Sequence, residues 1–267
     1  MWRPSALLAV LTAVLVSVLL SACGTTAKEA ARANNAESLY AEARDDMASG
    51  AFDRAITNLQ RVEALATGTL LGQQATLELA YAYWRTGERA QALATLDRFI
   101  RLHPSSPAFD YALYLRGLAN FNDNLGILSE LSRQDITERD QQASREAYQS
   151  FAQLVQQFPN SRYAEDARVR MDFIINALAA YEVHVARYYF RRGAFLAAAN
   201  RAQQAVAEYQ NSPAAEEALF LMAQSYDRLQ LPELRDGAER VLRASFPESP
   251  YLRPGATPRQ RSWWQFW

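Results

Sequence analysis

The chain has 267 residues, of which 49% are hydrophobic and 21% charged, and its formal net charge is −1. This composition predicts one well-packed body, either a long domain or a solenoid. There is no basic excess of the kind that nucleic-acid-binding proteins carry, so no nucleic-acid partner is expected. One cysteine cannot form a disulfide within the chain.

The first segment, residues 1–22, is predicted to be a secretory signal peptide. Arg3 supplies a positive charge, an uncharged apolar run follows over residues 6–20, and two small residues precede Cys23. The run is shorter than the roughly 20 residues that span a bilayer. A cysteine directly after small residues resembles a bacterial lipobox. The alternative is a secreted protein with one buried cysteine.

The lipobox resemblance implies a lipid anchor on Cys23, as an N-palmitoyl and S-diacylglycerol cysteine. Stable anchoring needs two membrane signals, and three acyl chains exceed that number. Gly24 stands where an aspartate would resemble an inner-membrane retention signal. We therefore expect an outer-membrane protein, lipid-anchored with its body on the periplasmic face. Residues 23–36 are the expected lipidated linker.

Residues 37–250 are predicted to be helical throughout, because apolar residues recur three and four positions apart, without convincing period-two alternation. Short phrases recur along this segment, at residues 47–56, 84–93 and 192–198. Each phrase places a glycine in a turn and starts the next helix with a small residue. Glycine permits a tight turn, and alanine lets the two helices approach closely.

Each of three helices ends in a similar way, with an aromatic or aliphatic residue shortly before Pro104, Pro159 or Pro247. Together the marks resemble the tetratricopeptide repeat, whose period is about 34 residues. The predicted fold class is therefore all-α, a superhelical solenoid of about five helix-turn-helix repeats. The predicted units span 37–70, 73–105, 107–160, 162–212 and 214–247.

Two units depart from this pattern. The third carries a long insertion at residues 122–140, and long loops in compact folds are usually functional or disordered. In the fourth, the helical pattern over residues 163–192 is long enough for one helix or two. A Pro-, Arg- and Trp-rich tail at residues 251–267 follows the solenoid.

The sequence holds no pattern of residues suited to catalysis. His103 and His184 lie in different units, and no spacing of histidines, cysteine and carboxylates resembles a metal site. There is no Gly-rich phosphate loop and no serine in a nucleophile-elbow context. We therefore expect that the chain is not an enzyme and that it binds no cofactor and no metal.

Four segments carry a closer resemblance, at residues 97–104, 110–118, 158–167 and 181–189. They are similar to the BamD family, lipoproteins of the outer-membrane β-barrel assembly machinery. The resemblance extends from Cys23 to about Pro247, with five units in order and the third-unit insertion in place.

The resemblance implies a lipid-anchored scaffold. Members bind a periplasmic domain of the central β-barrel assembly protein through their C-terminal units and hold other accessory assembly lipoproteins. Their N-terminal units receive the C-terminal signal of unfolded outer-membrane proteins, which ends in an aromatic residue. Arg201 matches a family arginine implicated in contact with the barrel protein, although an intramolecular ion pair fits the sequence equally well.

Other candidate partner-binding residues come from the chain itself. Tyr40 and Tyr83, with Tyr81 and Trp84, could line an aromatic groove in units one and two, or could be inter-helix core. Arg98 and Arg101 could meet a carboxylate or peptide backbone, or could lie on a solvated helix face.

Four aromatic residues occupy the last five positions of the sequence, including Trp263, Trp264 and Trp267. Tryptophan favours membrane interfaces and protein hot spots. The tail is therefore expected to dock onto a partner or the membrane leaflet, and the alternative is a tail that fills the solenoid's own groove.

Two other functional classes stay open. Another periplasmic repeat lipoprotein, such as a pilus-secretin pilotin, would share the lipobox and the repeats but should lack the third-unit insertion. An enzyme or lipid carrier would need a polar cluster or a continuous apolar tunnel, and the sequence shows no such cluster.

Overall fold

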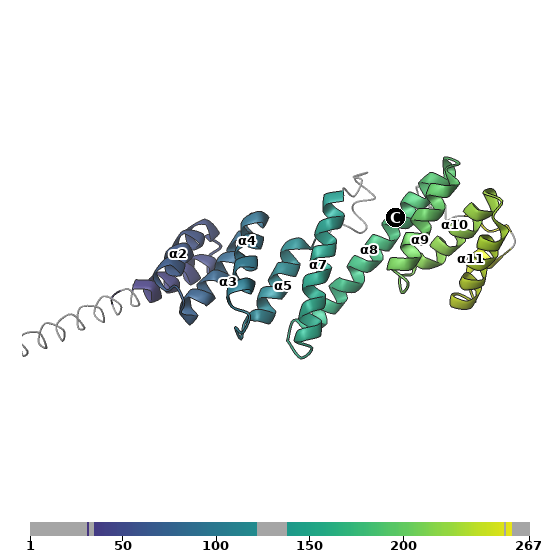
Figure 1. The fold of residues 1–267 in the computed structure, drawn as a ribbon. Helices are drawn as coiled ribbons and strands as arrows, with labels where there is room; N and C mark the ends of the chain where they lie inside the picture. The colour runs from purple at the N-terminus through teal and green to yellow at the C-terminus, as the bar shows by residue number, and fades with distance from the viewer. Residues whose placement is uncertain (1–30, 32–34, 122–137, 254, 258–267) are drawn as a thin grey trace, which may run out of the picture. The chain divides into compact units, whose positions relative to one another are not determined.

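The computed structural model describes residues 31, 35–121, 138–253 and 255–257. The chain divides into two compact units, each larger than a predicted repeat. They are called here the first unit, up to Ala119, and the second unit, from Asn120 onward. Regular secondary structure in the described residues is helical, with no strand (Figure 1). The predicted all-α repeat fold is confirmed. The signal peptide, Cys23, residues 122–137 of the insertion, and Trp263, Trp264 and Trp267 lie outside the described residues.

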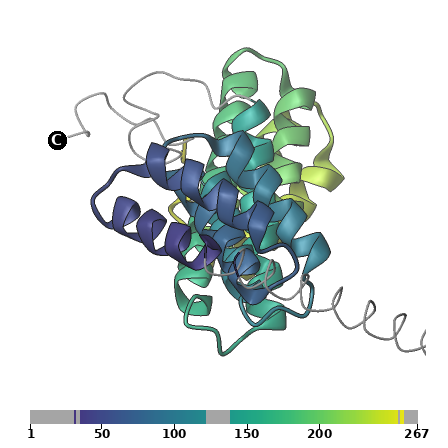
Figure 2. The ribbon, with the colours of Figure 1, turned by 90° about the vertical axis from the view of Figure 1, so that its left-hand side faces the viewer.

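The first unit is built from a helix at residues 35–48 and four helices that follow it. These are α2 (Phe52–Leu65), α3 (Leu70–Arg85), α4 (Arg89–Leu102) and α5 (Phe109–Asn120), whose last residue lies at the unit boundary. Figure 2 shows helix 35–48, in purple, beside α2, and Ala43 and Leu59 share one core cluster there. A second cluster joins α3, α4 and α5 around Leu96 and Phe99.

The second unit stacks five helices. They are α7 (Glu138–Gln157), α8 (Ala164–Arg191), α9 (Phe195–Glu208), α10 (Ala214–Arg228) and α11 (Pro232–Ser245), with a short 3₁₀ helix, η2 (Pro250–Leu252), at the end. Consecutive helices contact one another, and α8 also contacts α10. The segment over residues 163–192 is thus one helix of 28 residues.

The turns follow the predicted glycine marks. Gly50, Gly87 and Gly193 have φ angles of 80°, 81° and 77°. An added Cβ would meet nothing within 4 Å at these positions, so the left-handed backbone itself favours glycine there. Gly72 is different, because a Cβ at the start of α3 would lie 2.3 Å from the Ala66 carbonyl oxygen.

The small residues at the starts of α2, α4 and α9 are buried as predicted. Ala55, Ala92 and Ala198 are each 0% exposed. An alanine leaves the facing backbone free to come close, so the two helices of a hairpin pack tightly against each other. The helix-ending prolines also act as predicted, since α4, α7 and α11 each end two residues before Pro104, Pro159 or Pro247.

No helix in the described ranges is both long and apolar enough to cross a membrane. The longest, α8, carries charged residues at both ends, among them Glu165, Asp166 and Arg187.

Replacing Gly193 with alanine should destabilise the second unit by about 1–2 kcal/mol, because the turn then holds an L-residue in the left-handed region. Gly237→Ala, in the interior of α11 of the same unit, is the matched control. Its added Cβ would lie 3.9 Å from the Arg240 side chain, so this change should be neutral or stabilise by about 0.5–1 kcal/mol. Urea unfolding measures the change in the free energy of unfolding for each variant. Equal changes for the two variants would contradict the backbone argument.

Candidate partner-binding surfaces

The first unit presents an aromatic surface made by Phe52, Tyr81, Trp84 and Arg85, called here the N-terminal aromatic surface. The Phe52 and Tyr81 ring centroids are 6.5 Å apart, and those of Tyr81 and Trp84 are 5.8 Å apart. The exposed Arg85 guanidinium lies 4.9 Å from the Phe52 ring centroid and donates a 2.7 Å hydrogen bond to the Tyr81 hydroxyl. The three aromatic residues are half-buried, and the Arg85 guanidinium lies over the Phe52 and Tyr81 rings.

The four aromatic residues predicted to line one groove fall into two separate clusters. Tyr81 and Trp84 pack against the cluster around Leu96, whereas Tyr83 and Tyr40 pack against the cluster around Leu59. Tyr81, Tyr83 and Trp84 all belong to α3, and the helical period turns Tyr83 away from the other two.

Tyr40 and Tyr83 are also tied by their hydroxyl groups. The Tyr40 hydroxyl donates a 2.6 Å hydrogen bond to Glu78 Oε1, and the Tyr83 hydroxyl accepts one of 2.7 Å from Gln60 Nε2. Burial raises the pKa of Glu78, against the opposing effects of the Tyr40 hydrogen bond and Arg44. Burial and the bond to Glu78 raise the pKa of Tyr40. Both tyrosines therefore connect neighbouring helices.

The two candidate arginines of α4 have different surroundings. Arg98 pairs with Glu63 of α2 at 2.8 Å, and the same carboxylate oxygen accepts a 2.8 Å hydrogen bond from Thr76 of α3. The Glu63 carboxylate therefore connects α2, α3 and α4 of the first unit. Arg101 is exposed, and no ion pair to it is found among the described residues. Arg98 keeps 44% of its side chain exposed despite this pair, so both arginines present charge to solvent.

Arg201, on α9, forms an ion pair within the second unit. Its Nη1 lies 3.1 Å from Glu182 Oε2 on α8, and it approaches Gln204 Oε1 at 3.5 Å. The Glu182 side chain is 2% exposed and that of Arg201 is 42% exposed. The carboxylate thus holds one end of a guanidinium whose outer side still faces solvent.

A second inter-helix ion pair lies in the same unit. Arg187 of α8 meets Glu217 of α10 at 2.7 Å, and both side chains are largely buried. Glu182 on α8 and Glu217 on α10 are therefore each neutralised by an arginine on a neighbouring helix. Buried charges paired in this way are costly to leave alone, so the two pairs constrain how α8, α9 and α10 meet.

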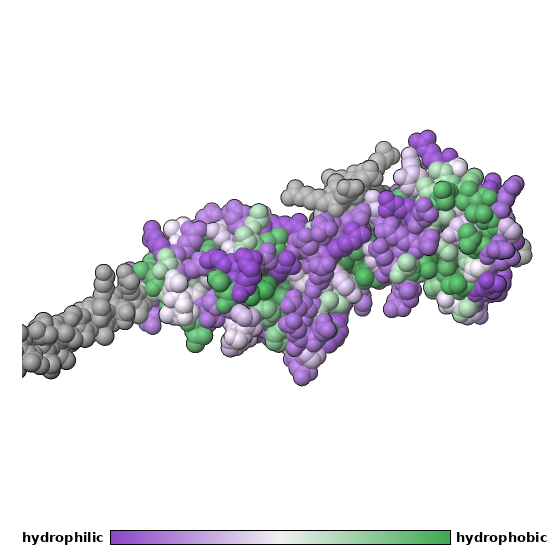
Figure 3. All heavy atoms as spheres, in the orientation of Figure 1, coloured by the Kyte–Doolittle hydropathy of each residue, from purple (hydrophilic) through white to green (hydrophobic). Residues whose placement is uncertain are grey.

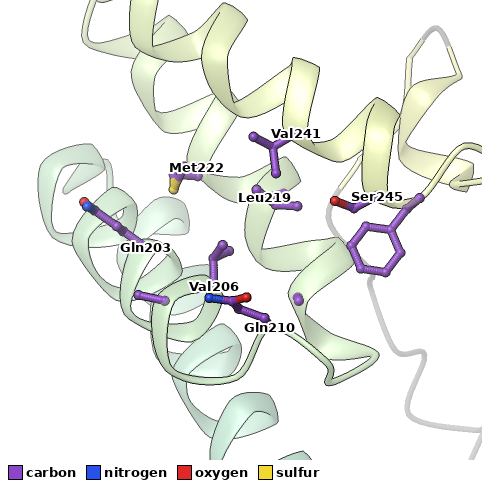
Figure 4. Close-up of a pocket in the computed structure, with 10 residues that line it drawn as sticks. Gln203, Val206, Gln210, Leu219, Met222, Val241 and Ser245 are labelled. Carbon is purple, nitrogen blue, oxygen red and sulfur yellow. The ribbon is translucent and has the colours of Figure 1, made fainter.

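The second unit also contains a pocket of about 330 Å³ between α9, α10 and α11. Figure 4 shows Val206 of α9, Leu219 and Met222 of α10 and Val241 of α11 around it, and Phe246 lines it as well. The remaining lining residues include the polar side chains of Gln203, Gln210 and Ser245.

Apolar side chains are also exposed around this end of the unit. Figure 3 shows apolar residues in green among hydrophilic ones in purple over the region of α10 and α11. Leu234 and Val241, two turns apart on α11, are 50% and 47% exposed. The described residues contain no group of three or more metal-ligating side chains.

Glu182 and the pocket are features that sequence reasoning missed. A signal for Glu182 was present, because it stands among apolar residues within α8. No comparable signal exists for the pocket, whose walls come from three helices.

A family model described as "Outer membrane lipoprotein" matches residues 32–252. The chain is 44% identical over 263 residues to "Outer membrane protein assembly factor BamD" of Neisseria meningitidis serogroup B, covering 97% of this chain and 98% of that protein. The protein of the same name from Xylella fastidiosa (strain Temecula1) is 35% identical over 259 residues, covering 97% and 88%. Among solved structures, the MamA protein aligns with a TM-score of 0.39 and 15% identity, covering 85% of this chain and all of that one.

Replacing Arg201 with methionine should destabilise the second unit by about 1–3 kcal/mol, because the buried Glu182 carboxylate loses its partner. Adding Glu182→Gln should recover part of that loss, since the double variant buries no unpaired charge.

The matched control is Arg243→Met on α11, whose pair with Glu239 is exposed on both sides and should cost less than about 0.5 kcal/mol. Chemical unfolding of these three variants and of the unchanged chain measures their free energies of unfolding. A cost for Arg201→Met no larger than that of the control would contradict the assigned role of the pair.

Proposed function

The chain belongs to the BamD family of outer-membrane lipoproteins, and from this premise we propose that it is a lipid-anchored scaffold for the assembly of outer-membrane β-barrel proteins. The observation that carries the proposal is the similarity to named assembly factors over 97% of the chain. Matches of that extent include the leading segment and all the helices, so the proposal concerns the whole chain. A binding role, with no catalytic step, agrees with the names of these relatives.

The anchor of this scaffold is Cys23. Its place after an apolar run and two small residues supports lipidation, and the family description of an outer membrane lipoprotein agrees. Gly24 in the next position supports delivery to the outer membrane. The helical units then lie on the periplasmic face, within reach of other lipid-anchored assembly components.

The second unit is the proposed contact for the periplasmic domain of the central barrel protein. Arg201 carries this part of the proposal because Glu182 fixes one end of its side chain while 42% of that side chain stays exposed. A guanidinium has five N–H donors in a rigid plane, so donors remain for a carboxylate or carbonyl of the partner. An arginine held in place loses less conformational freedom on binding than a mobile one.

The first unit is the proposed contact for unfolded barrel proteins. The N-terminal aromatic surface offers half-buried rings to the aromatic end of an incoming chain, and Arg85 supplies a cation above those rings. Arg101, exposed on α4, is available for a peptide carboxylate or backbone carbonyl. Tyr40 and Tyr83 support this unit from within, whereas Arg98 is held by Glu63 and still keeps 44% of its side chain exposed.

The second candidate function is a pilus-secretin pilotin, which would share the anchor and the repeats. The relatives reported above are named for barrel assembly, so that alternative is not favoured.

The test is recovery of the tagged chain from gently solubilised outer membranes, with identification of bound proteins by mass spectrometry. We expect a large β-barrel protein with periplasmic domains in stoichiometric amount. Arg201→Lys keeps the charge opposite Glu182 but loses the planar fork, and should lower recovery of that protein about two- to tenfold.

Arg243→Lys, on the exposed side of α11, is the control and should leave recovery unchanged. A secretin or pilus component in place of the barrel protein would overturn the proposed function. Full recovery with Arg201→Lys would leave the function intact and remove Arg201 from the interface.

A further inference from the structure

We propose that the aromatic segment at residues 262–267 folds back onto the second unit of its own chain and places one tryptophan side chain in the pocket between α9, α10 and α11. The proposal concerns an intramolecular contact and stands apart from the assembly role.

The chemistry of the pocket suits an indole ring. Val206, Leu219 and Met222 supply apolar walls, and the methionine thioether is a favourable contact for an aromatic ring. Gln210 and Ser245 bring side-chain oxygens to the same pocket, and a buried indole N–H needs such an acceptor. A tryptophan combines both requirements in one side chain.

The size of the pocket points to the same occupant. Its volume of about 330 Å³ is at the lower end of the range for small-ligand sites, which is about 300–1,000 Å³. Such a space fits one large side chain rather than a helix. Val241 on its wall is 47% exposed, so apolar surface is open for burial there.

The path of the chain brings the segment to this place. Tyr251 stacks on Phe220 of α10 at 4.7 Å between ring centroids. Five residues later, Ala256 packs against the core cluster that contains Phe220 and Leu219, and Leu219 also lines the pocket. Trp263 is seven positions after Ala256, and this stretch spans at most about 25 Å when extended. The segment therefore starts beside the pocket with enough chain to enter it.

Charged residues of both signs adjoin the pocket-lining residues in sequence, two glutamates and also Arg240 and Arg243 on α11. Arg259 and Arg261 precede the tryptophans. Glu208 directly follows the lining residue Ala207, and Glu248 is two residues after Phe246; both glutamates are exposed. A short connection also gives the segment a high effective concentration at the pocket, of millimolar order, which favours the intramolecular contact over a partner.

The experiment uses the lipid-free chain from Gly24 to Trp267 with Trp84→Phe, so that the only tryptophans left are the three in the tail. It measures their fluorescence emission and their quenching by acrylamide. We expect emission shifted to the blue and quenching weaker than in a free peptide of residues 256–267. Val241→Glu should shift the emission to the red and raise the quenching constant about twofold, because it places a charge on the pocket wall.

Leu234→Glu is the matched control, since Leu234 is equally exposed on the same helix and does not line the pocket. It should leave both signals unchanged. In a second measurement, the chain ending at Thr257 should bind the free peptide, and Val241→Glu should abolish that binding. Binding of the free peptide by the unsubstituted chain ending at Thr257 does not depend on how any substituted chain folds.

Three results would overturn the proposal. Quenching equal to that of the free peptide would show that the tail does not dock. A blue shift that depends on protein concentration would assign the contact to a second copy. A blue shift that appears only on addition of vesicles containing anionic lipid would assign the tail to a membrane.

Discussion

Close approach between neighbouring helices is the constraint on which the rest of the structure depends. On α9, Ala198, Ala202 and Ala205 follow one another at helical spacing and are each 0% exposed. The latter two share a cluster with Val183 of α8 and Leu221 of α10. Because alanines fill this face, the three helices lie close enough for side chains at its edge to reach across, and Arg201 meets Glu182 there. A larger residue on the alanine face would separate the helices and break that pair.

This packing decides which side chains are free for partners. Each helical hairpin packs its apolar face against the next hairpin, so the side chains left for partners are those on the outward faces. In the first unit Tyr40 and Tyr83 connect helices, whereas Arg101 and the N-terminal aromatic surface stay accessible, and Arg98 is both paired with Glu63 and exposed. In the second unit Arg201 serves both purposes, held from inside and exposed outside. The proposed partner contacts of the two units rest on this division.

Much of the fold could be predicted because its marks are local. A glycine with positive φ, an alanine at a close approach and a proline beyond a helix act on their immediate neighbours, and all three recur in the sequence. The partners of the candidate site residues could not be predicted in the same way. Arg98 and Glu63 are 35 positions apart, and whether they meet depends on how three helices stack. The separation of Tyr83 from Tyr81 by the turn of α3, and the pocket built from three helices, likewise appear only in three dimensions.

We propose that this chain takes part in the assembly of β-barrel proteins into the outer membrane. The most direct measurement is to deplete it in the bacterium that makes it and follow newly made barrel proteins, separating their folded and unfolded forms by resistance to unfolding in detergent. We expect unfolded barrel proteins to accumulate after depletion while other lipoproteins still reach the outer membrane. Barrel proteins that fold at an unchanged rate after depletion would contradict it.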